Sequence, residues 1–345
     1  MKFICGPMAT ISHPAFRILI EKFGGCDEYF TEMINAGSLL NDGPFEKYYV
    51  NPAPVPGKVV WQLTGTDRAR MAEAAKRLVE LPGIGLDVNM GCSAPDIYKT
   101  GAGIGWMLRP LEETREMVRS VGEVISSYNK SHPELKESGM ERRFSVKLRL
   151  GDEDFTEEGL FAFCDMLVEN GVKLLTLHPR TKKEKLARPA RYFYCQNLAE
   201  RYKKEGVSLY LNGNIKDSAS ASYAAGLCPD CSGIMISRAA VQKPWIFREL
   251  KKSFGGEGEY ESGCESELTV DMKQLCLDYI KDVEVYQPPE FWKTRLQRFF
   301  TYFAMNFTFG HYAQTQFINA SDNQDLIERI EDFFAKCPEE RFKKL

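Results

Sequence analysis

One cysteine in a glycine-flanked turn is the first residue whose surroundings suggest chemistry. Residues 89–95 read Asn-Met-Gly-Cys-Ser-Ala-Pro and directly follow a short apolar run. A free thiol has a pKa of about 8.5 and is mostly protonated at neutral pH, so Cys92 suits a proton donor better than a thiolate nucleophile. No general base or second metal ligand lies near it in the sequence. The alternative interpretation is a small buried hydrophobic residue, the usual role of a free cysteine.

Two polar turns later in the chain suggest a phosphate site. Asn212-Gly213-Asn214 closes one apolar run, and Ser237-Arg238 closes the next. Backbone N–H groups of a tight glycine turn, together with a guanidinium, can hold a phosphate monoester. The alternative is a strand-to-helix turn that simply requires glycine.

Two single residues have a comparable ambiguity. Lys147 stands midway through an otherwise apolar segment, and His178 follows another. Lys147 is either a salt-bridged residue or a cation beside an electron-rich ring system. His178 is either a core histidine with satisfied hydrogen bonds or a donor to a cofactor.

A basic segment and a cysteine pair complete the candidates. Residues 180–191 hold six basic side chains and one acidic one, which indicates either a solvated loop or a contact with a phosphate backbone. Cys228 and Cys231 form a lone CxxC, which only the distant Cys264 and Cys276 could complete as a structural zinc site. We therefore expect no metal.

The composition describes an ordinary globular protein. The 345 residues are 43% hydrophobic and 27% charged, with a formal charge of −3. These values exclude wholesale disorder and collagen, and the ten cysteines form no regular disulfide framework. No segment approaches the roughly 18 apolar residues that span a membrane, and the first residues turn polar too early for a signal peptide. We expect a cytoplasmic protein without a membrane association.

The elements that must position these residues are eight strands alternating with helices. The predicted strands are residues 3–8, 27–32, 59–63, 85–89, 144–150, 174–178, 208–212 and 233–236. Most have one apolar face and one face that ends in a polar residue, as in Leu86 and Val88 against Asp87 and Asn89. A doubly wound sheet would bury both faces under helices, whereas a (β/α)8 barrel gathers the polar strand ends at one mouth. We therefore predict a TIM barrel.

The predicted domain organisation changes after the last strand. Residues 1–252 form the barrel, residues 253–266 are a linker rich in Gly, Ser and Glu, and residues 267–345 form an all-helical domain. Leu296, Phe299, Phe300, Phe303 and Phe307 recur at helical spacing. We interpret them as the core of a helical bundle, with a base-stacking platform as the alternative.

Taken together, the motifs resemble the tRNA-dihydrouridine synthase family. The matching segments, in the family's order between residues 4 and 250, are 6–9 (Gly-Pro-Met-Ala), 13–17 (His-Pro-Ala-Phe-Arg), 31–33 (Thr-Glu-Met), 62–65 (Gln-Leu-Thr-Gly), 87–92 (Asp-Val-Asn-Met-Gly-Cys), 99–103 (Lys-Thr-Gly-Ala-Gly), 146–149 (Val-Lys-Leu-Arg), 177–181 (Leu-His-Pro-Arg-Thr), 212–215 (Asn-Gly-Asn-Ile), 238–239 (Arg-Ala) and 244–247 (Pro-Trp-Ile-Phe). The sequence departs from the family's usual pattern at Ser93, Pro179, Asn214 and Ser237.

The resemblance implies an FMN-dependent oxidoreductase that uses NADPH, or NADH, to reduce a uridine of tRNA to 5,6-dihydrouridine. Hydride passes from flavin N5 to uracil C6, and Cys92 protonates C5. The cofactor-binding residues it implies are Pro7, Met8, Ala9, Gln62, Lys147, His178, Asn212, Gly213, Asn214, Ser237 and Arg238. Asn89, Arg180 and Lys99 are implied substrate contacts. The target base leaves its stack, and the basic segment and the helical domain grip the tRNA, with no obligate protein partner.

Two other functions remain open at this stage. The first is an FMN barrel oxidoreductase that acts on a free small-molecule pyrimidine, which shares the phosphate turns and Lys147 but leaves the basic segment unexplained. The second is a non-catalytic RNA-binding barrel, which would bind tRNA without a flavin.

Overall fold

Eight parallel strands close into a barrel. The computed structural model describes residues 1–184, 187–255 and 268–345. The barrel strands are β1 (Lys2–Cys5), β2 (Glu28–Phe30), β4 (Val59–Thr64), β5 (Gly85–Met90), β6 (Arg143–Leu148), β7 (Leu174–Leu177), β8 (Ser208–Asn212) and β9 (Gly233–Ile236). Pairing of β2 with β4 closes the ring, and the short β3 (Ile34–Asn35) extends β4. The predicted barrel is therefore confirmed, and β3 is an addition to it.

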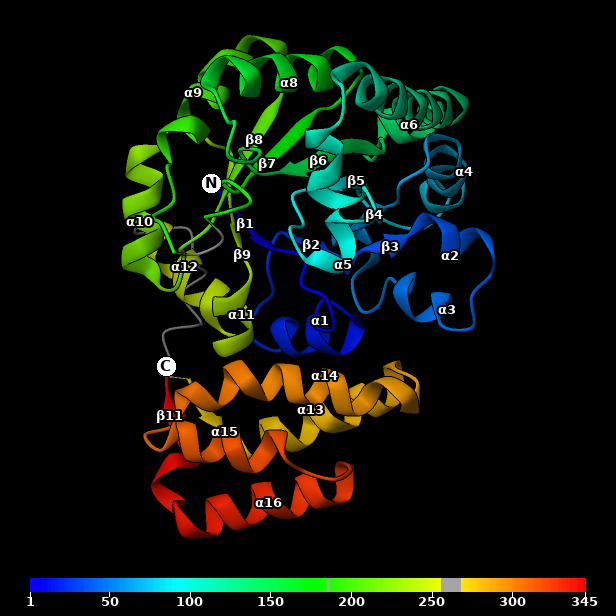
Figure 1. Ribbon diagram of the computed structural model, residues 1–345. Coiled ribbons are helices and arrows are strands. Elements are labelled where there is room, and N and C mark those ends of the chain that lie inside the picture. The colour runs from blue at the N-terminus through cyan, green and yellow to red at the C-terminus, as the bar shows by residue number, and fades with distance from the viewer. Residues whose placement is uncertain (185–186, 256–267) are drawn as a thin grey trace. The chain divides into compact units, whose positions relative to one another are not determined.

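Helices connect the strands on the outside of the ring. They are α2 (Ala36–Leu40), α3 (Glu46–Tyr49), α4 (Arg68–Val79), α5 (Pro95–Tyr98), α6 (Leu111–Ser131), α7 (Pro133–Glu137), α8 (Glu157–Glu169), α9 (Phe193–Tyr202) and α10 (Ser218–Leu227), with 3-10 turns at η1 (Pro56–Lys58), η2 (Gly103–Leu108) and η3 (Lys203–Glu205). Figure 1 shows α4, α6, α8, α9 and α10 arranged around the strands. Asp67, Thr156 and Asp217 cap α4, α8 and α10 by accepting backbone N–H bonds.

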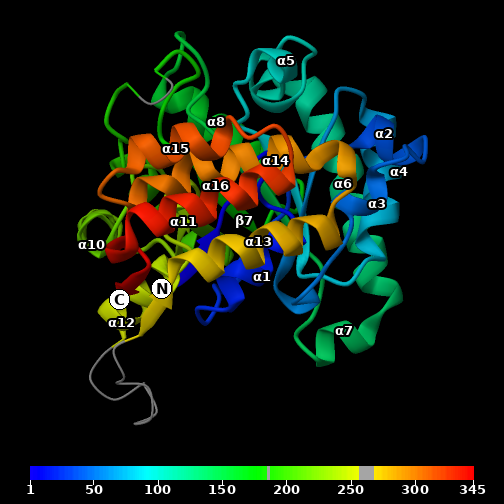
Figure 2. The same cartoon turned by 90° about the horizontal axis from the view of Figure 1, so that it is seen from below.

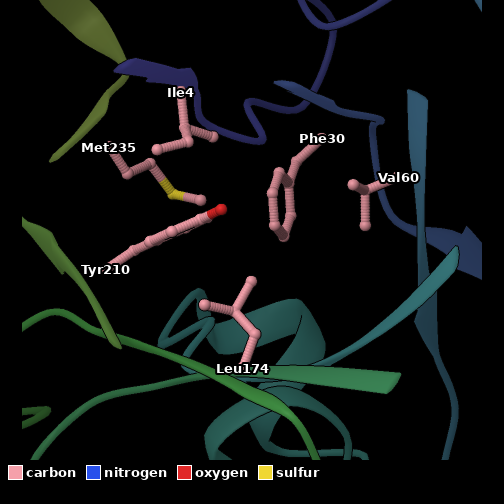
Figure 3. Packing of buried hydrophobic residues seen from close by; sticks show 6 residues of the cluster. All are labelled: Ile4, Phe30, Val60, Leu174, Tyr210 and Met235. Carbon is pink, nitrogen blue, oxygen red and sulfur yellow. The ribbon is translucent and has the colours of Figure 1, made fainter. Parts of the chain in front are cut away.

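An apolar plug fills the interior of the barrel. Ile4, Phe30, Val60, Leu174, Tyr210 and Met235 are buried and point toward one another from six strands (Figure 3). Because side chains alternate along a strand, the residues two positions further along point into the same interior. Val60 is thus followed by Gln62, Tyr210 by Asn212, and Leu174 by Thr176, so polar residues come to lie above the plug.

A buried ion pair lies at the opposite end of the interior. Arg143 donates to both carboxylate oxygens of Glu28, at 2.9 and 2.6 Å, and the Tyr210 hydroxyl donates to the same carboxylate at 2.8 Å. Burial alone would raise the pKa of Glu28, but the hydrogen bonds and charge of Arg143 outweigh it and lower that pKa to about 2. The base of the barrel is therefore held by charge, whereas its middle is held by apolar contact.

The chain divides into two compact units. The first comprises Met1–Pro7 and Asp27–Ile236, which is the barrel; the second comprises Met8–Cys26 and Ser237–Leu345. The helices of the second unit are α1 (Pro14–Glu21), α11 (Arg238–Gln242), α12 (Ile246–Phe254), α13 (Met272–Tyr286), α14 (Pro289–Phe303), α15 (Gly310–Ile318) and α16 (Asn323–Lys336), with 3-10 turns at η4 (Ala304–Asn306) and η5 (Pro338–Glu340). Most of the linker expected at 253–266 lies outside the described residues.

Aromatic side chains form the core of the second unit. Figure 2 shows α13, α14, α15 and α16 running alongside one another. Leu296, Phe299, Phe300, Phe303 and Phe307 are buried between them, and Phe299 stacks on Tyr279 with ring centroids 3.9 Å apart. The predicted bundle core is confirmed. A small antiparallel sheet pairs β10 (Thr269–Asp271), which leads into α13, with β11 (Phe342–Lys344), which follows α16. No helix among the described residues is long and apolar enough to cross a membrane.

Candidate active site

Strand register gathers the predicted polar residues at one end of the barrel. Gln62 of β4 lies opposite Asp87 of β5, and Asn89 lies opposite Lys147 of β6. His178 directly follows β7, where its N–H donates to Leu148 of β6 at 2.9 Å. Asn212 is the last residue of β8, and its amide donates to the carbonyl of Met235 at 2.8 Å. Asn89, Lys147, His178 and Asn212 lie at or near the carboxyl ends of their strands, where barrel enzymes carry their sites, and Gln62 and Asp87 lie deeper in the barrel.

A chain of buried hydrogen bonds runs from Asp87 to the Cys92 turn. Gln62 Nε2 donates to Asp87 Oδ2 at 2.8 Å, and Asn89 Nδ2 donates to Gln62 Oε1 at 2.9 Å. Asn89 Oδ1 then accepts the backbone N–H groups of Gly91 and Cys92, at 3.2 and 2.9 Å. We call this chain the amide relay (Asp87, Gln62, Asn89 and the two N–H groups).

The Cys92 turn is also held from its far side. The Cys92 carbonyl accepts the N–H of Ile104 at 3.0 Å. Gly103 has φ +59°, and a Cβ at that position would lie 2.6 Å from the Cys92 carbonyl oxygen. Glycine is therefore required there, because any side chain would push the turn away. Cys92 itself is partly exposed, so its thiol is reachable.

Lys147 is a cation without a local counter-ion contact. Its side chain is partly buried, and no hydrogen bond or ion pair joins its ammonium to another side chain in the described parts of the chain. Burial, followed by the charge of Arg149, lowers its pKa to about 8, although the charges of Asp87 and Cys92 act in the opposite direction. A partly buried cation of this kind is suited to an anionic ligand.

Arg180 links the ends of β7 and β8 through hydrogen bonds to His178 and Asn214. Its Nη1 donates to His178 Nε2 at 2.9 Å, and its Nη2 donates to Asn214 Oδ1 at 2.8 Å. Because a guanidinium can only donate, Nε2 must be the acceptor, which places the proton of a neutral His178 on Nδ1. Its Nε also donates to the carbonyl of Arg188, at 2.5 Å. Arg180, expected as a substrate contact, thus binds three protein groups and is buried.

The Gly213 turn lies directly against His178. Gly213 has φ +115°, and a Cβ there would lie 2.8 Å from His178 Cδ2. Asn214 follows with φ 59°, in the left-handed region that asparagine tolerates better than most residues. The Tyr192 hydroxyl donates to the Gly213 carbonyl. The turn is therefore held both by the His178 ring and by the Tyr192 hydroxyl.

The remaining predicted contacts are more exposed. Lys99 follows α5 and is exposed, and Pro7 is partly exposed. Met8, Ala9, Ser237 and Arg238 belong to the second compact unit. Ser237 has φ −120°, which any residue adopts, so this position does not require glycine, and Arg238 is exposed.

The basic segment is largely neutralised by carboxylates. Lys182 pairs with Asp152, and Lys183 pairs with Glu153 at 2.8 Å. Arg191 pairs with Glu184 at 2.8 Å, and Lys185 lies outside the described residues. Asp152 and Glu153 belong to the loop after β6, some 30 residues earlier in the chain, so their pairing with the segment leaves no local signal in the sequence.

The Cys228–Cys231 pair is buried, and Cys228 contacts Tyr192 at the start of α9. The Cys228 thiol donates to the Tyr192 carbonyl at 3.2 Å, and both cysteines are almost inaccessible. Within the described residues no group of three or more His, Cys, Asp or Glu side chains is arranged to hold a metal ion. Cys264, a conceivable zinc ligand from the sequence, lies outside the described residues.

Comparison with known proteins identifies similar chains. The family model described as dihydrouridine synthase matches residues 4–288. A probable tRNA-dihydrouridine synthase of Aquifex aeolicus is 25% identical over 331 residues, which cover 95% of this chain and 95% of that protein. The tRNA-dihydrouridine synthase B of Pseudomonas syringae pv. tomato is 25% identical over 248 residues, covering 72% and 67%.

Among solved structures, an old yellow enzyme homologue from Zymomonas mobilis aligns with a TM-score of 0.47 at 12% identity. The alignment covers 73% of this chain and 89% of that one. Morphinone reductase aligns with a TM-score of 0.48 at 11% identity, covering 73% and 85%.

Proposed function

Because this chain belongs to the dihydrouridine synthase family, we propose that it reduces a uridine of tRNA to 5,6-dihydrouridine with bound FMN. The proposed electron source is NADPH or NADH. The observation that carries the proposal is the arrangement of Cys92, Asn89 and Lys147 at one barrel mouth. It combines a reachable thiol, an amide and a cation without a local partner, which are the groups needed to protonate, orient and charge-balance the reduction of a pyrimidine.

The residues of the mouth fit FMN. Reduced flavin is anionic, and the Lys147 ammonium offers it a charge that no described side chain neutralises by direct contact. The Gly213 turn offers N–H groups, and Asn212, Asn214 and His178 adjoin it, with Pro7 at the end of β1 and Gln62 on β4. Met8, Ala9, Ser237 and Arg238, which follow β1 and β9 in the chain, complete the proposed set. When bound, FMN supplies the hydride that adds to C6 of the uracil ring.

The chain's own residues have three tasks in this reaction. The thiol of Cys92 transfers its proton to C5 of the ring. Asn89 uses one amide N–H for Gln62, so its other N–H is available to a uracil carbonyl. Arg180 is proposed as a further substrate contact, because its guanidinium lies between His178 and the Gly213 turn at the barrel mouth. Lys99 is exposed and is proposed to contact the RNA.

A free pyrimidine is the second candidate substrate. The pairing of Lys182 with Asp152 and of Lys183 with Glu153 favours it, because paired cations attract RNA phosphates less than free ones. An enzyme of this kind would reduce free uracil or uridine without any RNA.

Nucleoside analysis separates these functions. The purified protein should be yellow and should release FMN on denaturation. Transfer RNA from cells that lack the gene should have lost dihydrouridine at one position, and the purified protein with NADPH should restore it there. A colourless protein that does not take up added FMN, or unchanged dihydrouridine in the deletion strain, would contradict the proposal. Equal activity on free uridine would favour the second candidate.

A further inference from the structure

We propose that Asp87 is a positioning residue, which holds the Cys92 turn in place through the amide relay. Asp87 lies on β5 and is completely buried, three hydrogen bonds away from the backbone of Cys92. The inference rests on the proposed function only for the role of the thiol. The structural coupling between residues 87 and 92 stands on the geometry alone.

The direction of every hydrogen bond in the relay follows from the first one. An ionised carboxylate only accepts, so Gln62 must turn its NH2 group toward Asp87. The carbonyl oxygen of Gln62 then faces Asn89, so Asn89 must donate to it with its own NH2 group. A side-chain amide has two distinct ends, so fixing one end fixes the other.

The last step transmits this orientation to the backbone. With its NH2 group committed to Gln62, Asn89 presents Oδ1 to the turn, where the oxygen accepts two N–H groups. If Asn89 were reversed, its NH2 group would face the N–H groups of Gly91 and Cys92, and the turn would lose both bonds. Asp87 therefore selects the one arrangement that holds the turn.

The surroundings of Asp87 offer the buried amides few alternative hydrogen-bond partners. Its second oxygen accepts the Ser145 hydroxyl at 2.8 Å, and Gln62 and Ser145 are completely buried like Asp87 itself. Water has little access to replace a lost bond, so the amides depend on the carboxylate. An ordinary buried carboxylate would contribute to stability without affecting one particular turn, and this difference can be measured.

Amide hydrogen exchange of the flavin-loaded protein tests the coupling directly. Asp87→Leu removes the acceptor, and we expect the Gly91 and Cys92 N–H groups to exchange about tenfold faster, the effect of losing about 1.4 kcal/mol of hydrogen bonding. Asp87→Asn should rescue the protection, because its side-chain oxygen still accepts from Gln62. Gln62→Met breaks the relay at the next link and should reproduce the leucine variant if that variant folds poorly.

The matched control is Thr176→Val. Thr176 is completely buried in the same barrel interior, and its hydroxyl has no hydrogen-bond partner in the described part of the chain. This variant should leave exchange at residues 91 and 92 unchanged. Protection at the turn that survives both Asp87→Leu and Gln62→Met, or that is lost equally in Thr176→Val, would overturn the inference.

A kinetic measurement adds the functional consequence. In Asp87→Leu, reduction of the flavin by NADPH should persist, whereas single-turnover transfer to tRNA should fall about 100-fold, as expected when a reacting group is misplaced by about 1 Å. A wild-type protein that is inactive on tRNA would contradict the proposed function while leaving the exchange result interpretable. Transfer to tRNA at the wild-type rate in Asp87→Leu would show that the relay does not position the thiol.

Discussion

Asp87 on β5 and Lys147 on the neighbouring strand β6 carry charges of opposite sign, and both have shifted pKa values. Burial raises the pKa of Asp87 from 3.8 to about 6, although hydrogen bonds from Gln62 and Ser145 and the charge of Lys147 oppose the shift. Burial lowers the pKa of Lys147 to about 8. Keeping this carboxylate and this ammonium charged in the barrel lowers the free energy of unfolding. Such shifted pKa values are typical of functional sites.

The carboxylate gives a stability prediction with a definite sign. The pKa of Asp87 is higher in the folded protein than in the unfolded one, so the folded state binds the extra proton between about pH 4 and 6. The Asp87 contribution to the free energy of unfolding should therefore fall as the pH rises through this window, by about 2–3 kcal/mol.

Asp87→Asn should abolish this dependence. Urea denaturation of both proteins between pH 4 and 7.5 should show the variant gaining stability relative to wild type as the pH rises, with the difference levelling off above about pH 6.5. A difference that stays constant with pH would mean that Asp87 titrates normally despite its burial.

At the scale of single elements, the turn after β8 makes the sharpest demand on residue type. Gly213→Ala would combine a left-handed φ of +115° with a Cβ that lies 2.8 Å from the His178 ring. We expect a loss of about 1–3 kcal/mol of stability and a weaker affinity for FMN. Thermal unfolding and flavin titration measure the two effects. Alanine at Gly226, where a Cβ meets no atom within 4 Å, is the matched control, and equal behaviour of the two variants would refute the role of the turn.

The base of the barrel gives the opposite pH dependence. The pKa of Glu28 is about 2 when folded and about 4.5 when unfolded, so its stabilising contribution is present above pH 4.5 and is lost as the pH falls toward 2. Glu28→Gln leaves Arg143 with a neutral partner in a buried site and should cost about 3 kcal/mol at neutral pH. Urea denaturation at pH 7 and pH 3 should show this cost shrinking in acid. A cost that is the same at both pH values would exclude the charge as its cause.

The barrel strands and helices were largely predictable from the sequence, whereas the side-chain contacts between different strands and loops were not. Alternation along residues 85–89 and 208–212 predicted which side chains enter the interior, because alternation is a local property of a strand. The amide relay and the pairing of Lys182 with Asp152 depend on the register between strands and on loops that meet only in the closed barrel. The two-residue β3 and the β10–β11 sheet are too short to leave a periodic signal.

For the whole molecule, the pairing of the basic segment changes the expectation for RNA binding. Because Lys182 and Lys183 already bind carboxylates, reversing their charge should weaken tRNA binding less than their number suggests. Removing the negative charges of Asp152 and Glu153 should have a clearer effect on tRNA binding. Asp152→Asn with Glu153→Gln frees both lysines and should tighten tRNA binding severalfold.

The salt dependence of binding is the decisive readout for that double variant. Two additional free cations near the RNA should steepen the slope of log K against log salt by up to about 1.5–2. Glu169→Gln on α8, which removes one of the two carboxylates that pair with Arg115 of α6, serves as the control. An unchanged slope in the double variant would mean that this loop does not face the RNA.

Single-turnover reduction of tRNA by Cys92→Ala tests the account most directly. The flavin-loaded variant and the wild-type protein are first reduced with NADPH and then mixed with tRNA that lacks dihydrouridine, and the product is quantified by nucleoside mass spectrometry. We predict that both proteins are reduced at similar rates, and that only the wild-type protein forms dihydrouridine rapidly, because the variant has no proton for C5. Dihydrouridine formation at the wild-type rate in Cys92→Ala, or none with the reduced wild-type protein, would contradict the account.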